Sequence, residues 1–206
     1  MIEKFCLFLT KKIRKSMPEI TDERAEVINY GLQLVIGEVP KTFIMLLIAY
    51  LLGVLKLSIL AFLIISPYRM FSGGFHLKTH IGCILGTTLF YCGNVMLSKV
   101  AVFYSIPAKI AFIIAVWAFS MCMIKLYAPA DTENVPIISK KIRKTKKIMS
   151  YITMTITLLV GAFIQDNIIS NIFIFGVLIQ TLTITRVMYK LTNNKYGYEE
   201  YCKSEM

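Results

Sequence analysis

Residues 67 to 83 read PYRMFSGGFHLKTHIGC, a polar stretch between two strongly apolar segments. The stretch contains a proline, an arginine, a pair of glycines, two histidines and a cysteine. Proline ends or breaks a helix, and adjacent glycines disfavour a helix interior because they permit backbone conformations that other residues resist. The sequence therefore predicts a break in the chain here, and the fold depends on whether the flanking apolar segments cross a membrane.

The composition indicates a membrane protein. Of the 206 residues, 56% are hydrophobic and 17% are charged, and the mean hydropathy is +0.65, which is too apolar for an ordinary soluble domain of this length. The five cysteines are an odd number at irregular spacings, which argues against a disulfide framework. The first 16 residues place apolar side chains near helical spacing among basic ones. This pattern predicts an amphipathic helix on a membrane surface rather than a cleaved signal peptide.

The number of membrane crossings follows from the basic residues. The candidate spans are the charge-free runs 42–55, 57–68, 81–98, 110–124, 148–165 and 167–185, although several are shorter than the roughly 20 residues that cross about 30 Å of hydrocarbon. A merged helix over 42–65 would give five crossings and put the basic loop 125–148 outside. With six crossings and a cytoplasmic N-terminus, only Lys56, Lys99 and Lys109 fall outside, so 20 of the 23 lysines and arginines are cytoplasmic, as the positive-inside rule requires.

We therefore expect an all-α integral membrane protein with six transmembrane helices and both termini in the cytoplasm. It forms a single polytopic domain over residues 1–206. An amphipathic N-terminal region, 1–37, precedes a six-helix membrane core, 38–185, and a cytoplasmic tail, 186–206. The stretch 67–83 then becomes a cytoplasmic or re-entrant segment between the second and third spans. A chain that folds back into the membrane edge satisfies its backbone only against protein or water, so this segment implies a lined cavity.

The stretch also brings a thiol and two imidazoles close together in the sequence. A thiolate is a far better nucleophile than a thiol, and a neighbouring imidazole can take its proton and later deliver it to a leaving amine. His80 precedes Cys83 by three residues, about 4.5 Å along a helix axis, whereas His76 precedes it by seven, about 10.5 Å along a straight helix. His76 is therefore a partner for Cys83 only if the chain between them bends.

Other interpretations use the same residues. His76, His80 and Cys83 recur at i, i+4 and i+7, on one face of a continuous helix, and all three residue types bind zinc, which would make a zinc-dependent membrane hydrolase. Alternatively, Cys83 is a small core hydrophobe and the histidines are interfacial polar residues. A small transporter is a further alternative, but Asp166, the only charge in the last two spans, is expected at an outer turn rather than in mid-span.

Three segments of the chain resemble a known family. RMFSGGFH, residues 69–76, followed by six residues and then Cys83, is similar to the histidine and cysteine signature of AgrB, the accessory gene regulator membrane endopeptidase of Gram-positive bacteria. YGLQ near residue 30 resembles the entry to the family's first span. KLYAPADTENVPI, residues 125–137, followed by KKIRKTKK, resembles its central cytoplasmic loop. Length and six-span topology also agree, so the resemblance covers most of the chain.

The resemblance implies a membrane-embedded cysteine endopeptidase of the bacterial cytoplasmic membrane, with no cofactor and no metal. Its substrate would be a short AgrD-like propeptide, whose acidic C-terminal tail is cleaved off while the remainder is held as a thioester. A cysteine or serine of the propeptide then attacks the thioester, which gives a cyclic thiolactone or lactone quorum-sensing peptide. On this resemblance His76 matches the family histidine and Cys83 the family cysteine, whereas His80 has no counterpart. A homodimer is compatible with the resemblance.

Other residues of the stretch receive supporting roles. Arg69 and Lys78 are expected to stabilise the thiolate or to hold the acidic end of the substrate, although positive-inside retention explains both equally well. Ser72 lies between them and is included with this group. The backbone amides around Gly73 and Gly74 are candidates for binding an oxyanion.

The basic run after the central loop has two interpretations. Its charges retain the loop in the cytoplasm and attract anionic lipid, at about 1 kcal/mol per residue close to the surface. The same charges are suited to capture of an acidic propeptide tail. We assign this role to Lys140, Lys141, Arg143 and Lys144. Nucleic acid is not expected as a partner, since topology explains the basic residues and no stacking platform accompanies them. Asp131 and Glu133 are candidates to orient His76, but their distance in sequence gives no geometric support, so only a dyad is predicted.

Overall fold

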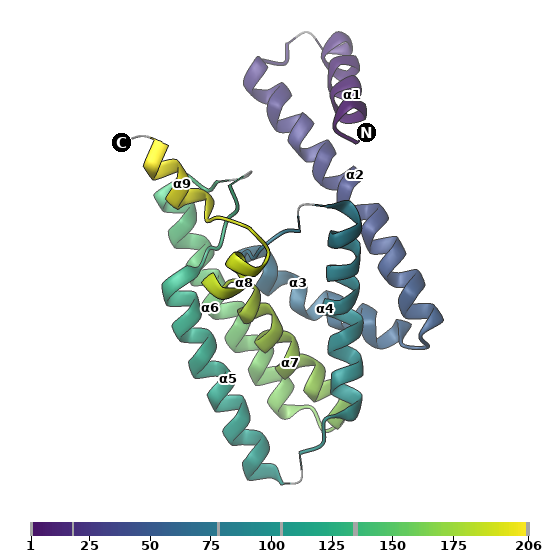
Figure 1. Ribbon diagram of the computed structural model, residues 1–206, viewed down its shortest axis with the longest axis vertical. Coiled ribbons are helices and arrows are strands. Elements are labelled where there is room, and N and C mark those ends of the chain that lie inside the picture. The colour runs from purple at the N-terminus through teal and green to yellow at the C-terminus, as the bar shows by residue number, and fades with distance from the viewer. Residues whose placement is uncertain (1, 18, 78, 104, 134–135, 205–206) are drawn as a thin grey trace.

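A computed structural model describes residues 2–17, 19–77, 79–103, 105–133 and 136–204, and within these ranges every regular element is a helix. In chain order the helices are α1 (Ile2–Ser16), α2 (Asp22–Leu51), α3 (Leu55–Ser72), α4 (His80–Val100), α5 (Ile106–Tyr127), α6 (Lys140–Phe163), α7 (Asn167–Thr183), α8 (Arg186–Leu191) and α9 (Gly197–Ser204). Figure 1 shows α3 to α7 gathered in one bundle, with α8 and α9 at one end of it. The predicted all-α fold is confirmed.

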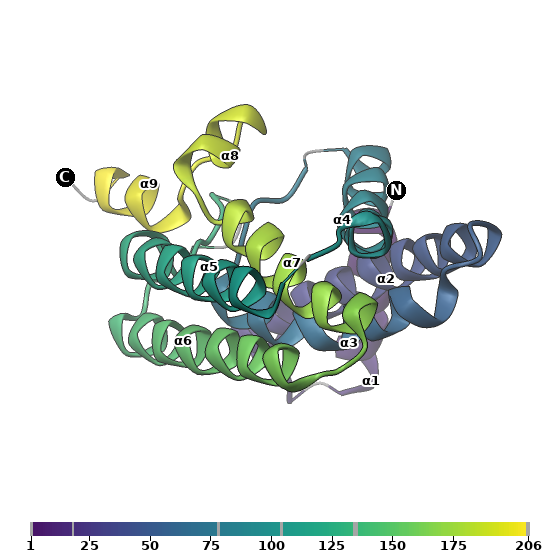
Figure 2. The same cartoon turned by 90° about the horizontal axis from the view of Figure 1, so that it is seen from below.

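Helix α7 is the centre of this bundle. It packs against α3, α4, α5 and α6, and the view from below in Figure 2 shows it between α4 and the pair formed by α5 and α6. Every residue from Ser170 to Val177 is buried, so this part of α7 is enclosed on all sides rather than along one stripe. The sequence of α7 is correspondingly apolar for most of its length, with a few buried polar side chains that bond to neighbouring helices.

Among the residues that the structure describes, three helical segments are long and apolar enough to cross a membrane. They are Leu55–Ser72, Ile81–Val100 and Ile106–Tyr127, and α7 is apolar but shorter. The outward-facing side chains are apolar as well, since Leu89, Ile106 and Phe163 are each at least three-quarters exposed. Extensive apolar surface of this kind drives association in water, whereas hydrocarbon solvates it. The composition and these helices together fit a membrane protein.

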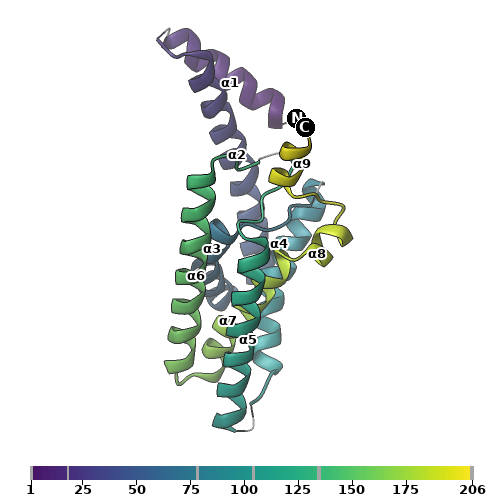
Figure 3. The ribbon, with the colours of Figure 1, turned by 90° about the vertical axis from the view of Figure 1, so that its left-hand side faces the viewer.

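Helix α1 packs against α2, and Figure 3 shows α1 and the first part of α2 standing beyond the end of the bundle, while the rest of α2 packs against α4 and α3. Cys6 is buried, and Thr10 Oγ1 donates to the Cys6 carbonyl at 2.9 Å and lies 3.3 Å from Asn29 Oδ1. Phe5 and Phe8 are exposed on the outer side, which leaves α1 an apolar surface for a membrane. Helix α2 continues through Pro40, so the predicted border between residues 37 and 38 lies inside one helix.

Buried polar side chains set the register between the helices. The hydroxyls of Tyr68 and Ser120 lie 2.9 and 2.8 Å from Thr181 Oγ1, and all three residues are buried. Asn94 Nδ2 donates to the Ile172 carbonyl at 3.1 Å. A polar group without a partner in an apolar interior costs several kcal/mol. These bonds therefore fix α3, α4 and α5 relative to α7, and they hold the end of α3 beside the end of α7.

Candidate functional site

The chain between α3 and α4 breaks as the sequence predicts. Helix α3 ends at Ser72 and α4 begins at His80. Gly73 and Gly74 have φ angles of 75° and 143°, which residues with a Cβ rarely adopt. The chain from Phe71 to Cys83 is therefore not one helix, since α3 ends before His76 and α4 begins after it.

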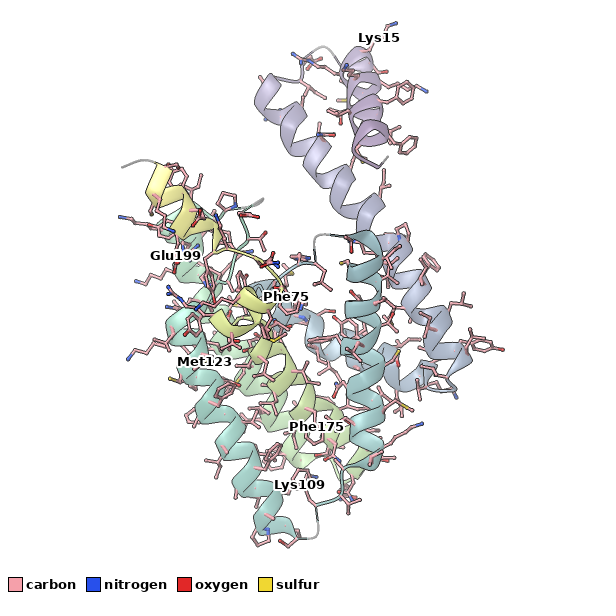
Figure 4. All side chains as sticks on the ribbon, viewed as in Figure 1. Lys15, Phe75, Lys109, Met123, Phe175 and Glu199 are labelled. Atoms are coloured by element: carbon pink, nitrogen blue, oxygen red, sulfur yellow. The ribbon has the colours of Figure 1, made fainter. Side chains whose placement is uncertain are left out.

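Residues 73–76, at the start of this break, are called the glycine segment. Backbone groups from other parts of the chain form hydrogen bonds to this segment. The Gly74 N–H donates to the Ala130 carbonyl at 2.9 Å, and the Ala130 N–H donates to the Ser72 carbonyl at 2.8 Å. These bonds form a short parallel bridge between Gly73 and Ala130. The Phe75 N–H donates to the Thr183 carbonyl at 3.4 Å. Figure 4 labels Phe75 at this junction of α3, α7 and α8.

Gln180 and Arg69 hold the same segment from inside the bundle. Gln180 is fully buried, and its Nε2 donates to Ser72 Oγ at 3.0 Å and to the Gly73 carbonyl at 2.8 Å. Its Oε1 accepts from Arg69 Nη1 at 3.1 Å, and Arg69 Nη2 donates to the Phe75 carbonyl at 3.3 Å. Arg69 and Ser72, expected to support substrate or thiolate, therefore brace the glycine segment.

The glycine amides do not fit the oxyanion role in this conformation. The Gly73 N–H donates to the Arg69 carbonyl at 2.9 Å, and the Gly74 N–H is taken by Ala130. Both donors are already bonded within the protein, so neither points at a vacant oxyanion position. Lys78, the remaining supporting candidate, lies outside the described residues.

His76 and Cys83 lie on either side of the start of α4. His76 is exposed, and its carbonyl accepts from Asn194 Nδ2 at 2.9 Å. Cys83 is half-buried in the first turn of α4, where its N–H donates to the carbonyl of the N-cap residue, Thr79, at 2.9 Å. The N-terminal turn of a helix carries partial positive charge. His80 opens the same turn, and its side chain is not among those that the structure describes.

The central loop, residues 128–139, is anchored by a buried ion pair. The Asp131 side chain is fully buried, and its Oδ2 accepts from Arg143 Nη1 at 2.9 Å and from the Ile137 N–H at 2.8 Å. The Arg143 guanidinium also lies 4.3 Å from the centre of the Tyr198 ring. Arg143, expected to bind an acidic tail, and Asp131, a candidate to orient His76, thus bind each other.

The other basic residues assigned to tail binding are exposed. They are Lys140, Lys141 and Lys144. They occupy the first turns of α6, which has no acidic residue in its first turn. Positive charge at a helix N-terminus opposes the helix dipole, at roughly 0.3–1 kcal/mol per charge. Helix stability therefore does not explain these lysines, and their position favours an interaction with anions outside the helix.

The C-terminal residues fold back over the central loop. The Tyr189 hydroxyl donates to the carbonyls of Ala130 and Asp131 at 2.9 and 3.2 Å, and the Gly197 N–H donates to the Asp131 carbonyl at 3.3 Å. The rings of Tyr189 and Tyr196 stack with their centres 4.2 Å apart. Burial raises the pKa of Tyr189 above its ordinary value, so the hydroxyl stays protonated and can donate.

Sequence reasoning missed these contacts, because it treated residues 186–206 as a polar tail. The only local signal is the cluster of tyrosines, asparagines and a glycine from 189 to 198. Such residues favour turns and caps, but they do not reveal which distant loop they will contact.

These features define an all-helical membrane protein in which a braced break between two helices presents a histidine and a cysteine. The chain belongs to the AgrB family, since the family model described as accessory gene regulator B matches residues 6–184. This membership relates it to the accessory gene regulator system.

Individual relatives cover most of the chain. An AgrB-like protein of Listeria welshimeri is 29% identical over 175 residues, which is 84% of this chain and 83% of the relative. An AgrB-like protein of Clostridium acetobutylicum is 26% identical over 208 residues, with 98% of this chain and 94% of the relative covered. No solved structure matches the chain.

Replacing Gly73 by alanine is expected to lower the free energy of unfolding by about 3 kcal/mol, from backbone strain and overpacking together. A Cβ at Gly73 would lie 2.2 Å from the Ala130 carbonyl oxygen, a backbone atom that cannot rotate away. The measurement is unfolding in detergent micelles, followed by the fluorescence of Trp117, the single tryptophan.

The matched control is Gly53→Ala. Gly53 also has a positive φ, 68°, but a Cβ there would meet nothing within 4 Å. This variant reports the cost of a positive φ without a close contact, about 1–2 kcal/mol, whereas Gly73 combines its positive φ with a ψ of −150°, which is nearly restricted to glycine. Equal losses in the two variants would show that the close approach to Ala130 is not the cause.

Proposed function

We propose that the chain is a membrane-embedded cysteine endopeptidase in which Cys83 is the nucleophile and His76 is the general base. Its substrate is a short AgrD-like propeptide of the accessory gene regulator system. The observation that carries the proposal is the break at residues 73–79. On a straight helix His76 would lie about 10.5 Å from Cys83 along the axis, whereas the break allows the histidine to turn back toward the start of α4.

The proposed reaction has two acyl-transfer steps. The Cys83 sulfur attacks the carbonyl carbon of the scissile amide while His76 takes the thiol proton and delivers it to the leaving amine. The acidic C-terminal peptide departs, and the remainder stays on Cys83 as a thioester. A cysteine thiol or serine hydroxyl of the same propeptide then attacks the thioester, which closes the ring and returns the proton to Cys83. Exchange of one thioester for another needs no external energy source.

The position at the membrane edge suits this chemistry. Water would hydrolyse the thioester before the ring closes, so the reaction requires surroundings that exclude water. The glycine segment lies at the end of a bundle whose flanks are apolar, with buried Gln180 beneath it. We propose that the propeptide binds here from the cytoplasmic leaflet, with its apolar part in lipid.

We propose six crossings by α2 to α7 in the bacterial cytoplasmic membrane. The glycine segment, the central loop and both termini then lie on the cytoplasmic side. Figure 4 supports this orientation, because Lys15 and Glu199 lie toward one end of the molecule and Lys109 lies at the other. The basic start of α6 lies at the same end as the glycine segment, since Arg143 pairs with Asp131 beside the Gly73–Ala130 bridge.

The orientation predicts which cysteines react in intact cells with a thiol reagent that does not cross membranes. Cys202, half-buried in α9, should react only after the membrane is permeabilised. A cysteine at position 102, where Val102 is 66% exposed in the loop before α5, should react from outside. Cys6 is unsuitable because it is buried, and Cys122 is replaced by serine to remove its exposed thiol. External labelling of Cys202 would overturn the orientation.

The dyad predicts that Cys83→Ser and His76→Ala each lower cleavage of a co-expressed propeptide by at least roughly 100-fold. His80→Ala should keep most activity, and a chelator should have no effect. Cleavage is followed by the release of the acidic C-terminal peptide. Cys122→Ser is the control, because it removes an exposed thiol distant in sequence from the glycine segment. Loss of activity in His80→Ala together with chelator sensitivity would instead support a zinc-dependent hydrolase.

We also propose that Lys140, Lys141 and Lys144 bind the acidic tail of the propeptide, whereas Arg143 supports the central loop. Changing the three lysines to glutamine should weaken propeptide binding in detergent roughly tenfold, since each exposed ion pair contributes about 0.2–1 kcal/mol. The loss should shrink at high salt. The unfolding temperature should stay the same or rise, because the change removes positive charge from the N-terminus of α6.

Two further variants test whether the three lysines bind the propeptide while Arg143 supports the central loop. Neutralising the exposed Lys11, Lys12 and Lys15 of α1 removes the same charge elsewhere and should leave binding unaltered. Arg143→Gln should instead lower the free energy of unfolding by about 3 kcal/mol, because it leaves the buried Asp131 carboxylate without its cation. Unchanged binding in the triple-lysine variant would remove these residues from substrate recognition.

A further inference from the structure

The side chain of Asn194 contacts the glycine segment at His76 itself. Asn194 Nδ2 donates to the His76 carbonyl at 2.9 Å. The same nitrogen lies 2.9 Å from Thr192 Oγ1 and 3.1 Å from the Thr192 carbonyl. An amide nitrogen carries two hydrogens, so one can be held by Thr192 while the other reaches His76. The Asn194 side chain is thus held by Thr192 and extends to the glycine segment.

A helix-ending turn points Asn194 at the loop. After α8, the Asn194 N–H donates to the Tyr189 carbonyl at 2.8 Å and the Asn193 N–H donates to the Lys190 carbonyl at 3.2 Å. Asn193 has a φ of 51°. This combination is the Schellman motif, in which a left-handed residue reverses the chain at the end of a helix. The direction of Asn194 is therefore set by the backbone and does not depend on a flexible tail.

The segments that carry Asn194 and His76 are also both bonded to the Ala130 carbonyl. Tyr189, in α8, donates its hydroxyl to the Ala130 carbonyl, and the Gly74 N–H donates to that same carbonyl. Tyr189 is 2% exposed, so this anchor is well packed. These two hydrogen bonds to one carbonyl fix the distance between α8 and the glycine segment.

From these contacts we infer that Asn194 is a positioning residue for His76. The inference rests on the proposed dyad. His76 is exposed on a loop, and its backbone torsions decide the direction in which its imidazole projects. The Asn194 amide holds the carbonyl of that residue and so limits these torsions. A hydrogen bond of this kind contributes about 1 kcal/mol, which corresponds to a fivefold to tenfold effect on a rate that requires the aligned imidazole.

The test compares Asn194→Asp with Asn193→Asp. A carboxylate has nearly the shape of the amide but only accepts hydrogen bonds, so Asn194→Asp loses the bond to His76. Asn193→Asp makes the same chemical change one residue earlier, on an exposed side chain. The readout is the rate at which iodoacetamide alkylates Cys83 in detergent between pH 5 and 9. Mass spectrometry of the Cys83 peptide excludes the other four cysteines.

In a dyad His76 contributes to the pH dependence of this alkylation rate, so His76→Ala should change the profile to that of a cysteine without an imidazole partner. We expect Asn194→Asp to lower the rate near neutral pH fivefold to tenfold and to move the profile toward that of His76→Ala, while Asn193→Asp follows the unaltered protein. With the propeptide as substrate, kcat should fall by a similar factor and KM should stay constant. A purely structural role would lower the unfolding temperature and leave the shape of the profile unchanged.

The outcomes separate the inference from the function on which it rests. An unaltered profile in His76→Ala refutes the dyad, whatever Asn194→Asp does. A changed profile in His76→Ala with an unaltered one in folded Asn194→Asp overturns the positioning role and leaves the dyad standing. If Asn194→Asp does not fold, Asn193→Gly and Asn193→Val replace it. Glycine keeps the left-handed turn and valine opposes it, so only the valine variant should reproduce the effect, and equal profiles would refute the inference.

Discussion

The bridge between Gly73 and Ala130 is the contact on which the rest of the site depends. It joins the break between α3 and α4 to the loop between α5 and α6, and the tail adds a third element through the Tyr189 hydroxyl. Backbone groups near a membrane find little water and must be paired within the protein. The bridge pairs groups that two helix ends would otherwise leave unsatisfied, and the missing side chain of Gly73 permits the approach.

The charges at this end of the bundle are of two kinds. Asp131 and Arg143 form an ion pair that is largely shielded from water and fixes the central loop. Arg69 is held by hydrogen bonds to Gln180 and the Phe75 carbonyl. The lysines at the start of α6 are exposed instead. A dense run of basic residues in the sequence therefore contains both structural and free charges. Only the free ones suit a mobile, acidic peptide, because a charge already paired in the fold would have to break that pair first.

Much of the architecture could be predicted from the sequence because the signals are local. The apolar runs predict helices, and the adjacent glycines predict the break after Ser72. The partners of the glycine segment could not be predicted, since Gln180, Thr183 and Asn194 lie more than 100 residues further along the chain. Nor does the sequence show that Ala130 comes close enough to accept the Gly74 N–H. The sequence also does not show that one helix runs through Pro40 and across the border between residues 37 and 38.

The contact between the tail and the glycine segment has a consequence for biogenesis. His76 and Cys83 are synthesised early, whereas Tyr189 and Asn194 follow helices α1 to α7 in the chain. A nascent chain thus carries its thiol for most of its synthesis before the residues that organise the neighbouring loop exist. Under the proposed function, the order of translation leaves His76 without its contact to Asn194 until the bundle is complete.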